Sequence, residues 1–453
     1  MRIQLFIIAL LLQIPLVAQA EVYEKTLANG LKVIVKEDHR APVVVQQIWY
    51  HTGSMDERTG TTGVAHALEH MMFKGTKDVP AGQFSKLIAA AGGRENAFTS
   101  YDHTAYFQQL HKSKLPLAMR LESDRMHNLQ VAKKEFDKEI KVVMEERRWR
   151  TDDDPHSLMY EKLMATAFEE HPYHHPVIGW MIDIQNMTSA DVLNWYKTWY
   201  APNNATLVIA GDVKPDEVFK LAQRYYGGIP AVDLPQRKAV GEAPQLGIQR
   251  IVVKAPAELP FLIMAYHAPT LRDAGKDWKP YALEVLAGVL DGNSSARLNK
   301  ALVREQQVAT DVGAGYDSVA RGPGLFTLEG TPREGKTVGD VENALREQLA
   351  LLVKDGVSAD ELQRVKAQVM AGEVYKRDSV FYQAMQIGQM ESDGLSYKDI
   401  PVMLQKLRAV TAQQVQDVAR EIFTDDHLTV ATLDPQPLSG KPRHIPAGGA
   451  DVR

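Results

Sequence analysis

The alternation of hydrophobic and polar positions predicts short strands in two separate parts of the chain. An Asn29-Gly30 pair between two alternating runs is typical of a tight hairpin turn. The apolar runs that follow are too short for buried helices and end at glycine, proline or aspartate. The predicted strands lie within residues 22–38, 41–57, 95–110, 204–212, 248–255 and 260–269.

Helical spacing of apolar residues separates these strands. The helix at 81–93 closes on the Gly92-Gly93 pair, and the TDDDP segment ends the helix that runs to residue 150. The predicted helices cover 63–74, 81–93, 114–129, 133–150 and 281–290. Strands and helices mixed in this way indicate an α+β or α/β domain in the first half, and we take the fold class to be α+β.

A repeated pattern indicates that the chain contains an internal duplication. Residues 187–212 align without gaps with residues 410–435, at an offset that pairs Thr188 with Thr411 and Thr206 with Thr429. Each copy ends a half of the chain. We therefore expect two related domains, each a mainly antiparallel sheet covered by helices. The expected divisions are a signal peptide (1–20), an N-terminal domain (21–231), a linker (232–248), a C-terminal domain (249–434) and a flexible tail (435–453).

The first 20 residues have the pattern of an export signal. A basic Arg2 precedes an apolar run from Leu5 to Val17, and Ala18-Gln19-Ala20 is a suitable cleavage site. The run is short for a membrane anchor and contains a proline, so cleavage is favoured over anchoring. No later run is long enough to span a bilayer. We expect an exported protein without a stable membrane span after cleavage.

Composition excludes several classes of function. The formal charge of −5 gives no basic footprint for nucleic acid or anionic membrane. The chain has no cysteine, which rules out disulfides, thiolate metal sites and a cysteine nucleophile. A transition-metal site in this chain must therefore use histidine and carboxylate ligands.

The segment His66-Ala67-Leu68-Glu69-His70 supplies such ligands. Residues four apart share one face of a helix, so His66 and His70 can address the same ion. Glu69 lies beside that ion in a position that suits a general base. The pattern alone is more common as a polar helix face, and a third protein ligand must come from elsewhere.

Carboxylates on the helix at 133–150 are candidates for that third ligand. Glu135, Glu139 and Glu146 fall on one stripe, while Glu145 lies about 100° away from it. Nearby lysines and arginines also allow the interpretation of a solvated, ion-paired face. Spacing alone does not identify the ligand.

The segment TGTTGVAHALEHMMFKGT resembles the inverted zinc motif of the pitrilysin/insulinase family, the inverzincins. The resemblance continues through AAAGGRENAFTSYDHTAYF, KEIKVVMEERRWRTDDDP and HPYHHPVIGWMIDI. It covers most of residues 22–230, and the C-terminal half at the level of a diverged repeat. It is closest to the bacterial members of about 400–450 residues that are related to mitochondrial processing peptidase subunits.

This resemblance implies a zinc-dependent endopeptidase that cleaves peptides or unfolded polypeptides. It assigns the zinc ligands to His66, His70 and Glu146, and the general base to Glu69. Glu139 receives a supporting role next to a ligand. One zinc ion per chain is implied, because the helix at 281–290 reads YALEVLAGVL and lacks both histidines.

The resemblance also implies a substrate-binding strand. In the family the Asn-Ala-Phe-Thr segment is an edge strand beside the metal, where an extended peptide can add by main-chain hydrogen bonds. The corresponding residues are Asn96, Ala97, Phe98 and Thr99. Without the resemblance we would interpret them as an ordinary edge strand.

The second half departs from the family pattern at one position pair. Members that act alone carry an arginine and a tyrosine, seven residues apart, that stabilise the substrate and the oxyanion. In the most natural alignment Val303 and Thr310 take these places, with Arg304 and Tyr316 nearby at a different spacing. We therefore expect a heterodimer with a homologous zinc-free subunit that supplies the missing pair.

Two further interpretations complete the picture. His171, His174 and His175 look like a second metal cluster, but their prolines favour a connecting loop. The rival function is a non-catalytic assembly subunit of the same fold, which is disfavoured because every member of the zinc motif is present. Resemblance to Gram-negative proteins places the exported chain in the periplasm.

Overall fold

The computed structural model describes residues 22–438, which form two halves with the same sheet topology. The first half has a six-stranded sheet and the second a five-stranded sheet. In strand order these are β1 (Val22–Thr26), β2 (Lys32–Glu37), β6 (Ala205–Gly211), β3 (Val43–Tyr50), β5 (Thr104–His111) and β4 (Arg94–Thr99), and β7 (Gln249–Pro256), β11 (Leu428–Gln436), β8 (Phe261–Ala268), β10 (Gly324–Pro332) and β9 (Ala309–Tyr316). The predicted signal segment and residues 439–453 of the predicted tail lie outside the described residues.

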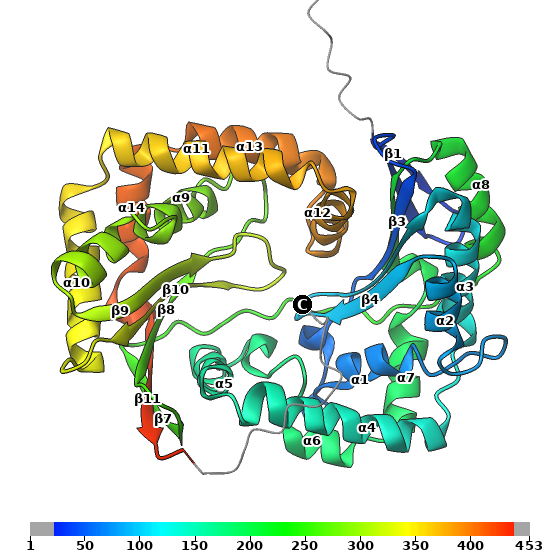
Figure 1. Cartoon of the computed structure of the whole chain (residues 1–453), viewed down its shortest axis with the longest axis horizontal. Helices are drawn as coiled ribbons and strands as arrows, with labels where there is room; N and C mark the ends of the chain where they lie inside the picture. Colours follow the sequence, from blue (N-terminus) through cyan, green and yellow to red (C-terminus); the bar gives the residue numbers. More distant parts are fainter. Residues whose placement is uncertain (1–21, 439–453) are drawn as a thin grey trace, which may run out of the picture.

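The described part of the chain has more helices in its first half than in its second. Those of the first half are α1 (Val64–Met71), α2 (Gln83–Ala90), α3 (Leu115–Asn128), α4 (Lys133–Arg147), α5 (Pro155–Ala167), α6 (Met181–Asn186), α7 (Ser189–Trp199) and α8 (Pro215–Tyr226). Those of the second are α9 (Lys279–Asp291), α10 (Val338–Asp355), α11 (Ala359–Lys376), α12 (Val380–Ser392), α13 (Ile400–Ala409) and α14 (Ala412–Ile422). In Figure 1, α4 and α6 run along one edge of the molecule and α11 and α13 along the opposite edge.

The topology confirms the α+β fold with an internal duplication. In each sheet one pair is parallel, β2 with β6 and β7 with β11, and the remaining pairs of the five strands that the sheets share are antiparallel. Helices α7 and α14 begin at the aligned residues Thr188 and Thr411, and both threonines close a capping box. The repeat seen in the sequence is therefore a repeat in space.

Residues 95–110, which the sequence predicted as a single strand, form a hairpin. β4 ends at Thr99 and β5 begins at Thr104, and the Ser100 side chain closes the turn by accepting the N–H groups of Asp102 and His103. Serine and aspartate bond to nearby backbone in this way, which breaks an otherwise strand-like run. The hairpin places β4 at one edge of the first sheet, with β1 at the other.

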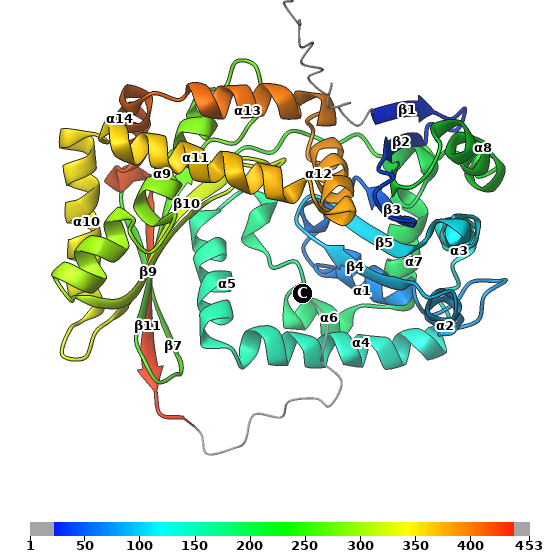
Figure 2. The ribbon, with the colours of Figure 1, turned by 45° about the horizontal axis from the view of Figure 1, so that its top comes forward.

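Each half covers its own sheet on one face and lends a helix to the other half's sheet. α12 packs on β3 and β6, with Ala384 and Ile387 against Trp49. Reciprocally, α5 packs on β7 and β11, with Met159 and Leu163 in the contact. Figure 2 shows both crossings, α5 beside β7 and β11 and α12 beside β3. The two halves are therefore joined by buried apolar surface on both sides.

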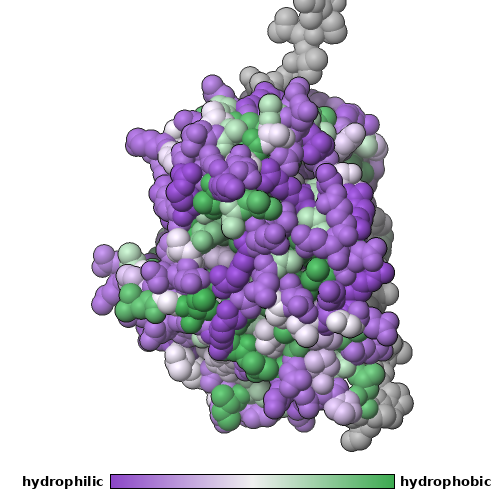
Figure 3. Space-filling view, turned by 90° about the vertical axis from the view of Figure 1, so that its left-hand side faces the viewer, coloured by the Kyte–Doolittle hydropathy of each residue, from purple (hydrophilic) through white to green (hydrophobic). Residues whose placement is uncertain are grey.

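The segment predicted as a linker, 232–248, contains no helix or strand and lies against the first half. Arg237 donates to Asp56, and Glu242 accepts the N–H groups of Glu169 and His171. No described helix is long and apolar enough to cross a bilayer. The end of the molecule at α10 is mainly hydrophilic with scattered apolar residues, as expected for a surface in water (Figure 3).

The reciprocal packing predicts that Leu163→Ala destabilises the whole molecule. Leu163 is fully buried in the cluster that joins α5 to the second sheet. Its truncation leaves a cavity that costs about 2–5 kcal/mol in the free energy of unfolding. Urea unfolding measures this loss, and Leu246→Ala is the control because Leu246 is 95% exposed. Equal stabilities of the two variants would contradict this role of α5.

Candidate metal centre

Helix α1, which carries both histidines of the motif, begins at a backbone contact that requires glycine. Gly63 precedes the helix with φ of +86°, and a Cβ on it would lie 2.3 Å from the Ile178 carbonyl oxygen. Gly179 makes the reciprocal approach, with its Cβ position 2.3 Å from the Thr62 carbonyl oxygen. A side chain at either position would displace the start of α1.

A buried carboxylate fixes the same end of the helix. Glu57 accepts the N–H of Gly63 at 2.7 Å and the N–H of Ala65 at 2.8 Å. It satisfies two free N–H groups at the positive end of the helix dipole. The sequence did not reveal this role, because Glu57 lies outside the spacing of any capping motif.

Two adjacent helices bring His66, His70 and Glu146 together. Glu146 on α4 places Oε2 3.2 Å from His70 Nε2 and 3.8 Å from His66 Nε2. The three ligand atoms lie within 4.8 Å of one another. Two imidazole nitrogens and a carboxylate oxygen are the donor set of a catalytic zinc site with an open position. Within residues 22–438 no other group of three or more His, Cys, Asp or Glu side chains could hold a metal.

The electrostatics of the two histidines differ. Burial lowers the pKa of His66 to about 3, so its imidazole is neutral and its nitrogen lone pair is available. Burial also acts on His70, but hydrogen bonds to Glu139 and Glu146 outweigh it and raise the pKa of His70 to about 9. The imidazole of His70 is therefore protonated and positively charged in the metal-free state. A bound metal ion would take over this positive charge.

Glu139 orients His70 through the ring nitrogen that does not face Glu146. Its Oε1 lies 3.0 Å from His70 Nδ1, and its Oε2 accepts from Lys74 Nζ at 2.6 Å. A carboxylate on Nδ1 fixes the tautomer that leaves Nε2 for a metal. The supporting role expected of Glu139 would act through this contact.

The other acidic residues of α4 point elsewhere. Glu135 pairs with Lys138, and Glu145 is 71% exposed and pairs with Arg148. Glu146 accepts from Arg150 at 2.8 Å through Oε1, which leaves Oε2 toward the histidines. The structure thus separates the carboxylates that sequence spacing left equivalent.

Glu69 lies at the junction of α1 and the edge strand β4. The hydroxyl of Thr99 donates to Glu69 Oε2 at 2.5 Å. Burial raises the pKa of Glu69, although the bond from Thr99 opposes this effect. Thr99 was expected only as a substrate-strand residue, and its contact with Glu69 was not foreseen from the sequence.

The remaining substrate-strand candidates lie along β4. Ala97 is buried, and Phe98 packs edge to face on Trp49 with ring centroids 5.4 Å apart. Asn96 accepts the N–H of Ala97. Ala97 and Phe98 thus direct their side chains into the protein, and the free edge of this strand offers its main chain.

The histidines of the HPYHHP segment do not join the metal group. His171 accepts the N–H of Tyr173 at 3.2 Å, and His175 is buried 3.9 Å from Glu57. Both lie in the connection between α5 and α6. Arg147 anchors the end of α4 to α5 by donating to Glu161, and to this connection by donating to the Gly179 carbonyl.

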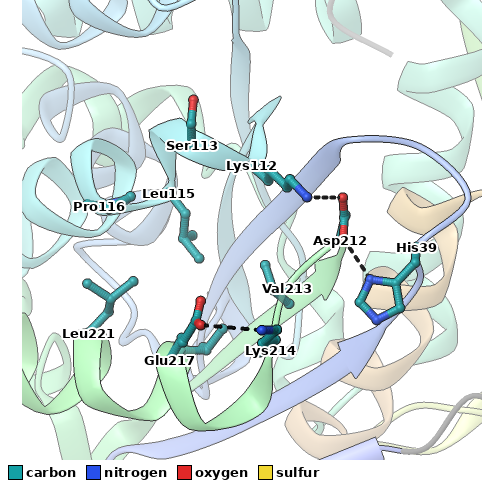
Figure 4. A pocket seen from close by; sticks show the side chains of 11 residues that line it. His39, Lys112, Ser113, Leu115, Pro116, Asp212, Val213, Lys214, Glu217 and Leu221 are labelled. Carbon is teal, nitrogen blue, oxygen red and sulfur yellow. Dashed lines mark hydrogen bonds and ion pairs between the residues drawn. The ribbon is translucent and has the colours of Figure 1, made fainter.

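A hollow of about 640 Å³ lies away from these residues, between α3, α8 and the turn after β2 (Figure 4). Its floor is apolar. At its rim Asp212 bonds both His39 and Lys112, and Lys214 faces Glu217. None of the residues of the metal group lines it.

Comparison with known families gives two matches, and the second begins inside the first half, before α7. Residues 32–179 match the family described as Insulinase (Peptidase family M16), and residues 186–369 match Peptidase M16 inactive domain. The zinc protease PqqE of Helicobacter pylori is 30% identical over 420 residues, covering 90% of this chain and 92% of PqqE.

Solved structures share the fold over nearly the whole chain. A protease from Helicobacter pylori matches with a TM-score of 0.87 at 28% identity, covering 92% of this chain and all of that one. The periplasmic protease PqqL from Escherichia coli matches with a TM-score of 0.79 at 21% identity, covering 92% of this chain and 49% of PqqL. The latter likeness concerns the fold alone.

The second half carries a counterpart of the motif without its histidines. α9 follows β8 as α1 follows β3, and its Tyr281-Ala-Leu-Glu284-Val285 aligns with His66-Ala-Leu-Glu69-His70. Glu284 accepts a hydrogen bond from the Ser318 hydroxyl. Burial raises the pKa of Glu284 to about 7. The carboxyl remains in this half, but no imidazoles stand beside it.

This raised pKa predicts that Glu284→Gln stabilises the protein at high pH. Between the unfolded pKa of about 4.5 and the folded value of about 7 only the unfolded chain ionises, so wild-type stability falls as pH rises. The glutamine variant lacks this loss and should gain up to about 3 kcal/mol above pH 7, and nothing below about pH 4.5. Urea unfolding at pH 4.5 and 8 measures it, and a pH-independent difference would contradict the assignment.

Proposed function

Because the chain belongs to the insulinase family of peptidases, M16, we propose that it is a zinc-dependent endopeptidase. The family resemblance inferred from the sequence is confirmed. The observation that supports the activity most directly is the convergence of His66, His70 and Glu146 beside Glu69. Substrates would be peptides or unfolded polypeptides, since an edge strand recognises extended chains.

The proposed ligands of the zinc ion are His66, His70 and Glu146, with one ion per chain. When bound, the ion would activate water for attack on a peptide carbonyl. Glu139 holds the imidazole of His70 so that its free nitrogen faces Glu146. Arg150 similarly holds the Glu146 carboxylate from its other oxygen.

Glu69 is the proposed general base. Thr99 occupies its Oε2, and within residues 22–438 no hydrogen bond is made to Oε1, which is left to accept a proton from water. The buried setting raises the pKa of this carboxyl, which suits a group that takes a proton and then delivers it to the leaving amine. A carboxylate of ordinary pKa would hold that proton less well.

β4 is the proposed substrate strand, with Asn96, Ala97, Phe98 and Thr99 along it. The strand pairs with β5 on one side only. An extended peptide on its other side would pair by main-chain hydrogen bonds. Since Thr99 also bonds Glu69, the strand would align the peptide with the base.

The proposed partner is a homologous zinc-free subunit. At the positions of the family's arginine and tyrosine, Val303 packs against the second core and Thr310 is exposed on β9. Tyr316 donates its hydroxyl to the Pro269 carbonyl, and Arg304 is exposed. The arginine and tyrosine that stabilise the oxyanion would therefore come from the second subunit. The signal segment supports export, with the periplasm as the proposed compartment.

Glu69→Gln tests the activity. The variant should lose about 10²–10⁴-fold in kcat, because the proton acceptor is gone while the metal ligands remain. Zinc content by metal analysis should stay at the wild-type value, whereas His66→Ala, His70→Ala and Glu146→Ala should each lose zinc. Glu145→Gln, an exposed neighbour of Glu146, is the matched control. Full proteolysis by Glu69→Gln would refute the mechanism.

Purification of this chain alone tests the partner. Cleavage of a random peptide library should be weak for the isolated chain. It should increase when a homologous zinc-free chain from the same organism is added, because the second chain supplies donors for the oxyanion. Full chelator-sensitive activity without a second chain would remove the partner but keep the zinc peptidase. Zinc binding without any cleavage in either case would favour an assembly subunit.

A further inference from the structure

Arg321 reaches from the second half into the first half next to the catalytic residues. It lies in the loop before β10, and its side chain is only 16% exposed. The guanidinium donates to both carboxylate oxygens of Asp56, at 3.0 and 3.3 Å, and to the backbone carbonyl of Asp102 at 3.0 Å. The backbone N–H of Arg321 donates to the Asp102 carboxylate at 3.0 Å. One residue thus makes four bonds across the boundary between the halves.

The first set of bonds fixes the turn that ends the substrate strand. Asp102 belongs to the turn between β4 and β5, directly after Thr99. Its other carboxylate oxygen accepts from Tyr173 at 2.6 Å, and Tyr173 in turn accepts the N–H of Gly322 at 2.8 Å. The turn is therefore bound to the Arg321-Gly322 backbone on both sides. Thr99, the last residue of β4, lies directly before this turn, and its hydroxyl donates to the Glu69 carboxylate.

The second set of bonds leads to the start of α1. Asp56 is followed by Glu57, whose carboxylate caps the helix at Gly63 and Ala65. The same segment is bound to the turn, since the N–H groups of Ser54 and Met55 donate to the carbonyls of Ser100 and Tyr101. Although burial opposes ionisation, Arg321 and Arg237 hold the pKa of Asp56 below its usual value. The ionised carboxylate keeps the bidentate bond to Arg321.

These two routes meet at Glu69. One runs through Asp102 and the turn to Thr99, the partner of Glu69, and the other runs through Asp56 and Glu57 to the helix that carries Glu69. We propose that Arg321 is a positioning residue of the zinc-free half, which sets the Glu69 carboxylate against the metal ligands without touching substrate. The inference rests on the proposed peptidase activity and gives the second half a task in it.

The experiment compares Arg321→Gln and Arg321→Lys with wild type in the full chain. Arg321→Gln should lower kcat about 10²-fold with little change in KM, since small misplacement of a catalytic group has effects of this size. Zinc content should stay at the wild-type value, because no bond of Arg321 is made to a metal ligand. Arg321→Lys keeps the charge but not the bidentate fork, and should recover part of the loss.

A matched control distinguishes positioning from general stability. Arg297 also lies in the second half and is 20% exposed, and it bonds a carboxylate and a carbonyl through Glu361 and Gly356. Arg297→Gln should remove a comparable ion pair and leave kcat unchanged. Hydrogen exchange in Arg321→Gln should be faster in residues 53–65 and 99–103, whereas Arg297→Gln should not affect these segments.

The outcomes separate this inference from the proposed function. If wild type cleaves and Arg321→Gln cleaves equally fast, Arg321 has no positioning role although the peptidase stands. The same conclusion follows if Arg321→Gln loses zinc, melting temperature and activity together and Arg321→Lys restores none of them, because that pattern is unfolding. If wild type cleaves neither alone nor with the homologous zinc-free chain, the peptidase proposal fails, while hydrogen exchange still reports whether Arg321 holds the two segments.

Discussion

The exchange of helices between the halves is the constraint on which the site depends. α5 leaves the first half to cover β7 and β11, and the chain returns through Tyr173 to the loop that holds Gly322. α12 leaves the second half to cover β3 and β6, and the residue that follows it, Asp393, places its carboxylate 2.8 Å from His103 Nδ1. Both crossings therefore end at the turn between β4 and β5. Apolar burial is non-directional, but it fixes the helices whose ends make directional polar contacts with this turn.

The internal repeat explains why one half has a metal group and the other does not. The two sheets share a five-strand topology, and the helices that follow β3 and β8 have a glutamate at the aligned position. In α1 that glutamate is flanked by imidazoles that meet Glu146, whereas in α9 the flanking residues are Tyr281 and Val285. A fold places side chains, but ligand chemistry decides what they bind. Burial has the largest effect on the pKa of Glu284 in α9, and the opposing charge of Lys376 has a smaller one.

Local patterns in the sequence predicted much of this molecule. The Asn29-Gly30 turn and the helix at His66 depend on spacing within a few residues, and the repeat depends on the alignment of Thr188 with Thr411. The structure has all three at the expected places. Family resemblance selected Glu146 among four acidic residues on one helix, and the geometry brings that residue to the histidines. Features that depend on local spacing or on family resemblance could therefore be predicted from the sequence alone.

What the sequence could not predict depends on contacts between distant segments. Nothing near Glu57 shows that it caps a helix, because the turn that returns it to Gly63 is set by the approach of Gly179 from another part of the chain. Residues 95–110 were interpreted as one strand because composition favours extension throughout, and only the side chain of Ser100 reveals the break. Arg321 is the most distant example, since its partners precede it by more than 200 residues.

The Arg321 network is better suited to fixing geometry than to adding stability. Arg321, which is largely buried, and Arg237, which is exposed, both face the buried Asp56 carboxylate, and Asp102 accepts from the Arg321 backbone. Burying such charges costs about as much as their attraction returns, whereas removing one partner leaves an unpaired charge and costs about 3–5 kcal/mol. The penalty thus falls on any arrangement in which the halves shift relative to each other. By this penalty the zinc-free half would hold Glu69 and Thr99 in one position relative to each other, as proposed, without supplying a group to the reaction itself.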